Sequence, residues 1–166
     1  MTHPKPERTI EIADEQSAWD VDPEPLRRAV ELVLEGASVR RAEVSVALVD
    51  DEAMREMNRR YLEHDYATDV LSFVLERSAD RVDGQIVVSV DTARAEAAGW
   101  GWTPADELLL YVIHGALHLV GHDDAKADER EAMRRREKEV LAQFGLEPRW
   151  KQAAPSGRRD REERES

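Results

Sequence analysis

The 166-residue chain contains no cysteine. This absence excludes disulfide bonds, thiolate metal ligands and cysteine nucleophiles, so any metal site must be built from histidine, aspartate or glutamate. Aromatic residues are also scarce, at 5% of the chain, whereas 36% of the residues are charged. No apolar run approaches the ~20 residues needed to cross a bilayer, and the N-terminal segment lacks the apolar core of a signal peptide. We therefore expect a cytoplasmic protein without a membrane partner.

The chain is strongly acidic, with a formal net charge of −12. Repulsion between this charge and phosphate groups opposes indiscriminate binding to nucleic acids, and we expect no DNA partner. A specific nucleic-acid substrate would require basic residues gathered on one face, or a protein partner that delivers the substrate. The arginines of segments 40–41 and 55–60 are candidates for such a face.

The order of apolar patterns predicts a single α/β domain, and the length of the chain fits one domain as well. Segments with the pattern of strands lie at 8–13, 43–49, 69–75 and 84–90. Segments with helical spacing or capping signals lie at 23–36, 51–62, 91–98, 104–120 and 126–144. We expect a small mixed four-stranded sheet covered by helices within residues 1–150. The charged segment 151–166 holds too little apolar material to fold, so we expect it to be disordered.

The most informative segment is HGALHLVGHDD, from His114 to Asp124. Residues four apart share one face of a helix, with Cβ atoms ~5–6 Å apart, so His114 and His118 can direct both imidazoles at one cation. Burying two unpaired imidazoles on one face of so apolar a helix would be costly. A glycine at the helix end, Gly121, can adopt the left-handed conformation and turn the chain back. The segment therefore predicts a metal site at the end of this helix, with a third ligand beyond Gly121 and an open position for water.

Two residues compete for the place of the third ligand. His122 carries the better donor for zinc, but Asp124 follows His118 by six residues, an interval that lets the chain turn at a glycine and return. We therefore favour Asp124 and keep His122 as the alternative. If Asp124 points inward, its neighbour Asp123 points elsewhere, and we expect Asp123 to orient one of the histidines from outside the metal.

The same segment counts against a zinc peptidase. Such enzymes carry H-E-x-x-H, in which the glutamate acts as general base toward the metal-bound water. Gly115 occupies the position of that glutamate in this sequence. A peptidase would need a base from elsewhere in the chain, which makes this function the least favoured.

Three blocks of the sequence match motifs of one known family. The segment 114–124 matches H-G-x-L-H-L-x-G-[YH]-D-H at every defined position but the last. Residues 58–73, NRRYLEHDYATDVLSF, are similar to N-x-x-Y-R-x-x-D-x-x-T-D-V-L-S-F, and residues 84–89, GQIVVS, are similar to a G-[DE]-I-x-[IL]-S strand. With these blocks in this order, the chain resembles the YbeY family of endoribonucleases.

The resemblance implies a single α/β domain, one zinc ion per chain bound by three histidines, and endoribonuclease activity specific for single-stranded RNA. The family acts in the maturation of the 3′ end of 16S ribosomal RNA and in ribosome quality control. The small ribosomal subunit or its assembly proteins are therefore expected partners. Carried over by position, the metal ligands are His114, His118 and Asp124, where the family has a histidine. The carboxylate adds negative charge and lessens Lewis acidity, so another divalent transition metal is also compatible with the site.

A second departure from the family concerns a basic residue. Leu62 stands where the family usually has an arginine after the tyrosine, and Arg59 or Arg60, one turn earlier, is predicted to replace it. We expect a metal-bound water to act at an RNA phosphodiester and Arg59 to offset charge in the transition state. The alternative is a non-catalytic ribosome-assembly factor in which the metal only fastens the helix end to the sheet.

Overall fold

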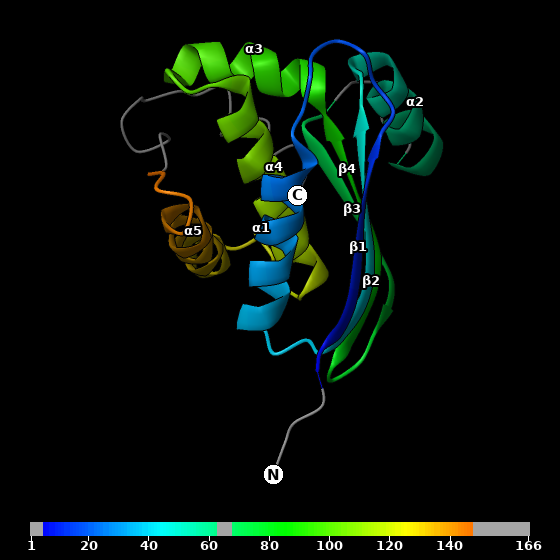
Figure 1. Cartoon of the computed structure of the whole chain (residues 1–166), viewed down its shortest axis with the longest axis vertical. Coiled ribbons are helices and arrows are strands. Elements are labelled where there is room, and N and C mark those ends of the chain that lie inside the picture. The colour runs from blue at the N-terminus through cyan, green and yellow to red at the C-terminus, as the bar shows by residue number, and fades with distance from the viewer. Residues whose placement is uncertain (1–4, 63–67, 148–166) are drawn as a thin grey trace.

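The computed structural model describes residues 5–62 and 68–147 of the chain. The elements follow one another as β1 (Glu7–Asp14), α1 (Pro23–Gly36), β2 (Arg41–Val49), α2 (Asp51–Leu62), β3 (Val70–Arg77), β4 (Arg81–Ser89), α3 (Val90–Trp100), α4 (Pro104–Leu119) and α5 (Ala127–Ala142). This arrangement confirms the predicted α/β class with a four-stranded mixed sheet (Figure 1). The segment predicted to be a disordered tail lies outside the described residues. Within the described ranges, no helix has the length and apolar character that a bilayer crossing requires.

The sheet has the strand order β1-β2-β4-β3. β1 pairs with β2 and β2 with β4 in parallel, whereas β3 runs antiparallel to β4 at one edge. The pairing of β3 with β4 is interrupted by a register shift between Val74 and Glu76. Such a bulge bends the strand and leaves its outer half irregular, so β3 offers a poor edge for pairing with a further strand.

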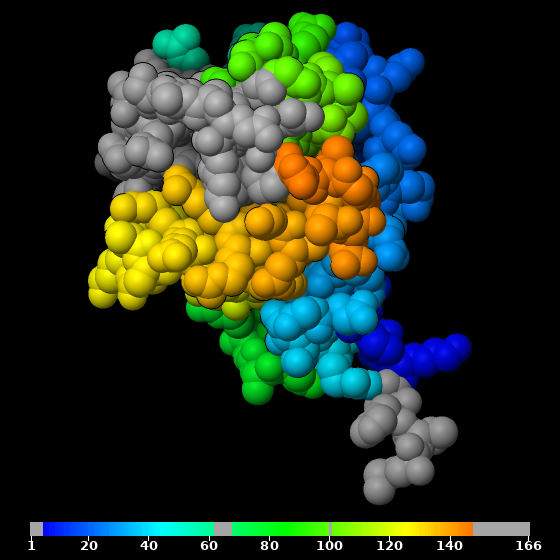
Figure 2. Space-filling model, turned by 90° about the vertical axis from the view of Figure 1, so that its left-hand side faces the viewer, coloured from blue at the N-terminus to red at the C-terminus, as the bar shows by residue number. Residues whose placement is uncertain are grey.

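Helices lie in layers on the two faces of the sheet. α1 and α4 cover one face, and their apolar side chains form the main core with those of the strands. α5 packs outside these two helices and forms much of the outer surface on that side (Figures 1 and 2). A smaller cluster around Met54 joins α2 to the opposite face. α4 is therefore enclosed between the sheet and a second layer of helix, and all its residues from Glu107 to Ile113 are buried.

A glycine in the middle of segment 114–118 sets the distance between α4 and the sheet. A Cβ atom on Gly115 would stand 2.7 Å from Ile86 Cγ2, closer than real Cβ atoms approach a neighbour, and 3.1 Å from Val70 Cγ2, which is also a tight contact. The hydroxyl of Ser72 on β3 donates a hydrogen bond to the carbonyl of Gly115 at 3.1 Å. The helix segment between His114 and His118 is thus held directly against β3 and β4.

The close approach of α4 predicts the effect of one added methyl group. Gly115→Ala should lower the free energy of unfolding by about 1–3 kcal/mol, because the new Cβ overpacks the contact with the sheet. Chemical denaturation measures the change. Gly99→Ala on α3 is the matched control, since a Cβ there would meet nothing within 4 Å. Alanine at this helical position should be neutral or slightly stabilising. Equal stability of the two variants would contradict the packing described here.

Candidate metal centre

The last turns of α4 bring two imidazole rings together, nearly perpendicular to one another with their centroids 4.7 Å apart. The helix begins with a Thr103 cap and a proline in its first turn, and it carries His114 and His118 one turn apart near its end. Their Nε2 atoms lie 3.1 Å from one another. The predicted position of these two histidines on one helix face is therefore found in the structure.

The chain turns back directly after this helix. Gly121 has a φ of +106°, in the region that favours glycine, and its N–H donates to the carbonyl of His118 at 3.1 Å. The next N–H, that of His122, donates to the carbonyl of Leu117 at 3.0 Å, which closes the helix end. The left-handed turn predicted at this glycine is thus present, and it directs the following residues toward the histidine pair.

Asp124 completes a group of three possible ligands. Its Oδ2 lies 3.6 Å from Nε2 of His114 and 3.8 Å from Nε2 of His118. Among the described residues, these three form the one group of histidine and acidic side chains close enough to hold a metal ion. A point equidistant from the three atoms lies about 2 Å from each, which is the length of a zinc–nitrogen or zinc–carboxylate bond.

Hydrogen bonds on the far side of each ring determine which nitrogen can bind a metal. Nδ1 of His118 lies 3.0 Å from the carbonyl oxygen of His122, and Nδ1 of His114 lies 3.2 Å from a carboxylate oxygen of Glu137 on α5. Both oxygens are acceptors, so each Nδ1 carries the hydrogen in a neutral ring. Each Nε2 then presents its lone pair to the other ring and to Asp124. Three electron-pair donors directed at one point repel one another unless a proton or a metal cation lies between them, and the spacing of the three atoms fits a divalent metal ion.

The charge states near neutral pH also suit a metal. Burial lowers the pKa of His118 below its ordinary value, and the neighbouring His114 imidazole lowers it further. The contact with His114 lowers the pKa of Asp124, against the opposing effect of burial. His118 is therefore neutral and Asp124 ionised near neutral pH, and these are the forms in which the two side chains bind metals.

The loop that carries Asp124 is held by two further side chains. Oδ1 of Asp123 accepts hydrogen bonds from the N–H groups of Asp124 at 2.7 Å and Ala125 at 3.2 Å. The guanidinium of Arg130 donates to the carbonyls of the same two residues, at 3.2 and 3.4 Å. The hydrogen bonds of Asp123 thus hold the loop that carries Asp124, and its predicted role in orienting a histidine stays a prediction. The atoms that contact the two Nδ1 groups come from Glu137 and from the backbone of His122.

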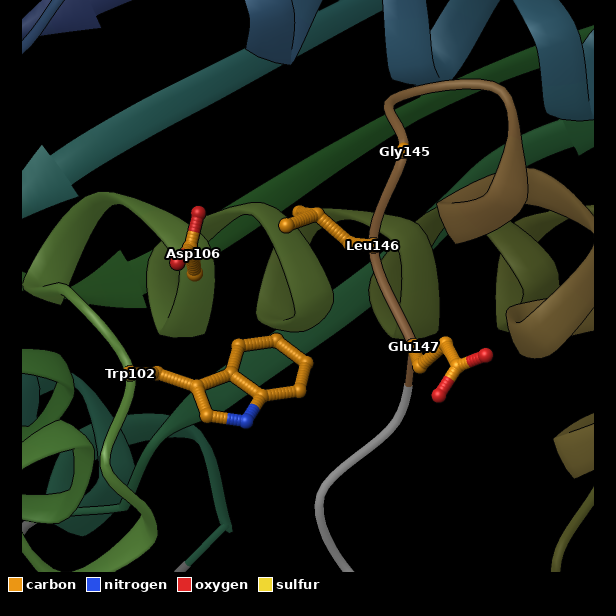
Figure 3. A pocket seen from close by; sticks show the side chains of 5 residues that line it. All are labelled: Trp102, Asp106, Gly145, Leu146 and Glu147. Carbon is orange, nitrogen blue, oxygen red and sulfur yellow. The ribbon is translucent and has the colours of Figure 1, made fainter.

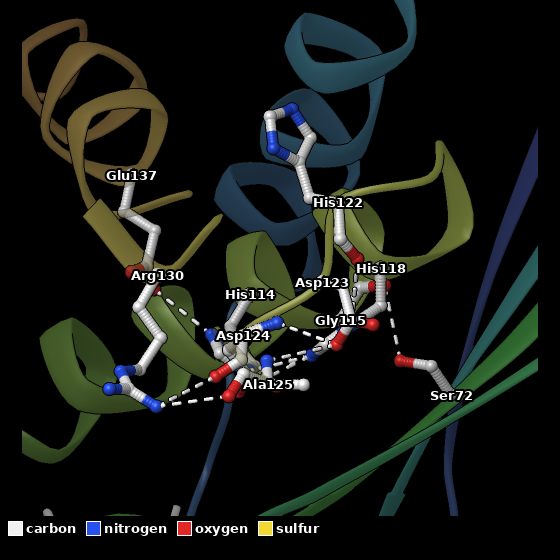
Figure 4. Close-up of polar contacts among 10 residues, drawn as sticks. All are labelled: Ser72, His114, Gly115, His118, His122, Asp123, Asp124, Ala125, Arg130 and Glu137. Carbon is white, nitrogen blue, oxygen red and sulfur yellow. Dashed lines mark hydrogen bonds and ion pairs between the residues drawn. The ribbon is translucent and has the colours of Figure 1, made fainter. Parts of the chain in front are cut away.

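The other two predicted site residues lie apart from this group. The imidazole of His122 points away from the histidine pair, and only its backbone takes part in the site (Figure 4). Burial and the nearby Arg136 guanidinium lower its pKa. Arg59 lies in the last turn of α2, exposed and ion-paired with Glu56. Because α2 packs on the opposite face of the sheet from α4, the role of Arg59 at a phosphate stays a prediction.

Sequence reasoning missed Glu137, which is 5% exposed in an otherwise highly charged helix. One signal points to it. Glu137 follows Met133 by four residues and precedes Leu141 by four, and both of these neighbours are buried. An acidic residue in the middle of an apolar stripe requires a buried partner, and here that partner is His114.

A separate pocket lies at the first turn of α4 and has a volume of about 330 Å³. It is lined by Trp102, Asp106, Gly145, Leu146 and Glu147 (Figure 3). At ~1.5 Å of rise per residue, Asp106 and His114 are about 12 Å apart along the helix. This pocket is therefore not part of the metal centre.

Comparisons with known proteins show the family of the chain. The family model of endoribonuclease YbeY matches residues 11–145. Endoribonuclease YbeY of Rhodopirellula baltica is 44% identical over 109 residues, an alignment that covers 64% of this chain and 56% of that protein. Endoribonuclease YbeY of Sulfurovum sp. is 39% identical over 144 residues, with 83% and 92% covered. The chain therefore belongs to the endoribonuclease YbeY family.

A solved structure supports the fold as well. The solution structure of TM1509 from Thermotoga maritima aligns with a TM-score of 0.57 and 26% sequence identity. The alignment covers 82% of this chain and 91% of that protein. The similarity thus extends over almost the whole domain rather than over the histidine motif alone.

The third ligand can be tested by metal analysis of purified variants. Removing a residue that only supports a metal ligand weakens metal affinity roughly 10–100-fold. Asp124→Ala should weaken it by more than this, because the change removes an atom that binds the metal. Asp124→His should restore binding. His122→Ala is the matched control, since this change keeps the carbonyl that contacts His118. Full metal in Asp124→Ala, with loss in His122→Ala, would transfer the ligand role to His122.

The contact between α5 and His114 generates a separate prediction. Glu137→Ala should weaken metal affinity roughly 10–100-fold, because His114 loses the acceptor that holds its ring orientation. Glu137→Gln should lose less, since the amide oxygen still accepts a hydrogen bond. Competition with a chelator measures both affinities, and the exposed Glu131→Gln on the same helix serves as control. The contact would be irrelevant to the site if Glu137→Ala bound metal as tightly as Glu131→Gln.

Proposed function

We propose that this protein is a zinc-dependent endoribonuclease that cleaves single-stranded RNA and acts in the maturation of the 3′ end of 16S ribosomal RNA and in ribosome quality control. The observation that carries the proposal is the convergence of two Nε2 atoms and one carboxylate oxygen in a chain of this family. The side chains of His114 and His118 are 17% and 29% exposed, so the group lies near the surface. A substrate can therefore approach it from solvent.

Each residue of the group has a defined task in this proposal. His114, His118 and Asp124 would hold the zinc ion, while Glu137 and the His122 carbonyl keep the two rings oriented. When bound, the ion supplies a Lewis acid that lowers the pKa of water toward ~7 and offsets charge on a phosphate. The carboxylate ligand lowers the net positive charge of the centre, which is why iron, manganese or nickel also suits this donor set.

The packing of Gly115 supports phosphodiester chemistry over peptide hydrolysis. A zinc peptidase of the H-E-x-x-H type places its general base at this position. Here the position faces Ile86 and Val70 so closely that even a methyl group would collide. The glutamate of such a peptidase therefore has no room on this helix while α4 contacts the sheet.

The acidic surface bears on partners and location. A net charge of −12 weakens the affinity for isolated RNA through phosphate repulsion. We propose that the small ribosomal subunit or its assembly proteins present the RNA, and that the protein works in the cytoplasm. Activity should therefore be higher on ribosome-bound than on free RNA.

The reaction class can be tested directly on purified protein. The protein should cleave single-stranded RNA weakly by itself and leave casein intact. A chelator or the His114→Ala change should remove the cleavage while circular dichroism shows that the fold persists. His122→Ala should retain activity, because its imidazole lies outside the group. Gel analysis of labelled RNA, with and without ribosomes, measures these effects.

Two results would decide against the proposal. RNA cleavage that resists the chelator would mean that a contaminant or another site is responsible. Full occupancy by metal without cleavage of free or ribosome-bound RNA would favour the non-catalytic assembly factor, in which the metal only joins α4 to its neighbours.

A further inference from the structure

The outer half of β3 exposes apolar side chains beside a cation. Val74 is 46% and Leu75 75% exposed, and with Tyr61 they are the exposed large hydrophobic residues of the described chain. Arg77, at the end of the same strand, is exposed too. We refer to Val74, Leu75 and Arg77 as the β3 lip. Two exposed aliphatic side chains with a guanidinium at the edge of a sheet suit a ligand that has both apolar and anionic parts.

The β3 lip lies next to the metal centre. Val74 pairs with Gly84, and a Cβ on Gly84 would stand 2.7 Å from Leu119, the neighbour of His118. Nη1 of Arg77 lies 3.4 Å from the position that a Cβ on Gly121 would occupy. The guanidinium therefore lies at the turn that connects His118 to Asp124.

Arg77 places a cation on the side of β3 that faces the end of α4. Glu76, the exposed residue before it, pairs with Asp83 whereas Arg77 pairs with Val82, so the Glu76 carboxylate leaves the strand on the other side. None of the ion pairs found among residues 5–62 and 68–147 involves Arg77. A guanidinium in this position can bind a phosphate with two parallel hydrogen bonds. In a protein of net charge −12, such a cation beside the metal site is placed where a phosphate chain would need it.

We infer that the β3 lip binds the single-stranded RNA that enters the metal centre. Arg77 contacts a phosphate next to the one that is cleaved, and Val74 and Leu75 contact the faces of unstacked bases. Single-stranded RNA offers such bases, whereas a duplex keeps them stacked inside. This inference rests on the proposed function and adds the surface by which the substrate is held.

A peptide strand is a poorer occupant of the same edge. Pairing by a peptide requires a regular row of free N–H and C=O groups. The register shift between Val74 and Glu76 interrupts that row where the exposed side chains lie. The lip therefore offers side chains rather than backbone to its ligand.

The role of the β3 lip can be tested by steady-state kinetics. The substrate is a labelled oligouridylate, and the metal-loaded full chain is assayed at several salt concentrations. Arg77→Ala should raise KM about tenfold, with kcat nearly unchanged, and should reduce the slope of log KM against log salt by about 0.7, the value for one phosphate contact on a single strand. Arg77→Lys should restore the slope. Leu75→Ser should raise KM roughly threefold to tenfold without changing the slope. Arg28 is an exposed arginine on α1, outside the β3 lip, so Arg28→Ala is the control for the lost charge.

The outcomes separate the inference from the proposed function. If the unmodified protein cleaves in a metal-dependent way, and Arg77→Ala and Leu75→Ser match Arg28→Ala, the lip does not hold RNA although the function stands. Concentration-dependent self-association that disappears in Leu75→Ser would assign the lip to a second copy of the chain and contradict the inference. Absence of metal-dependent cleavage in the unmodified protein would overturn both proposals.

Discussion

The candidate metal centre depends on one electrostatic constraint, which is the convergence of three electron-pair donors on one point. The outward hydrogen bonds of His114 and His118 turn both Nε2 lone pairs inward, and Asp124 adds a carboxylate oxygen. Such an arrangement is repulsive unless a proton or a metal cation lies between the donors.

The surrounding helices and strands hold the three donors in these positions. Gly115 allows α4 to lie on the sheet without the overpacking that a Cβ would cause, and Gly121 turns the chain back toward the helix. α5 closes the group from the outer side through Glu137. Three separate layers, the sheet, α4 and α5, thus fix the ligands, and a shift of any one of them would change the geometry of the metal centre.

Much of this arrangement was predictable from local sequence, and the rest was not, for physical reasons. The histidine pair and the turn at Gly121 follow from helical spacing and glycine conformation within a few residues. The partner of His114, in contrast, lies 23 residues further along the chain, and its contact depends on how α5 packs, which periodicity does not encode. The predicted strands 43–49 and 84–90 also begin later than β2 and β4, which start at Arg41 and Arg81. These polar first residues pair with one another across the sheet, and an apolar pattern does not reveal such a pairing.

The central claim is that His114, His118 and Asp124 bind one metal ion, and anomalous diffraction from crystals of the metal-loaded protein tests it most directly. One anomalous peak is predicted, about 2 Å from Nε2 of each histidine and from Oδ2 of Asp124, at the distance of direct coordination. A peak at His122, or metal-loaded crystals with no peak between these three side chains, would contradict the account.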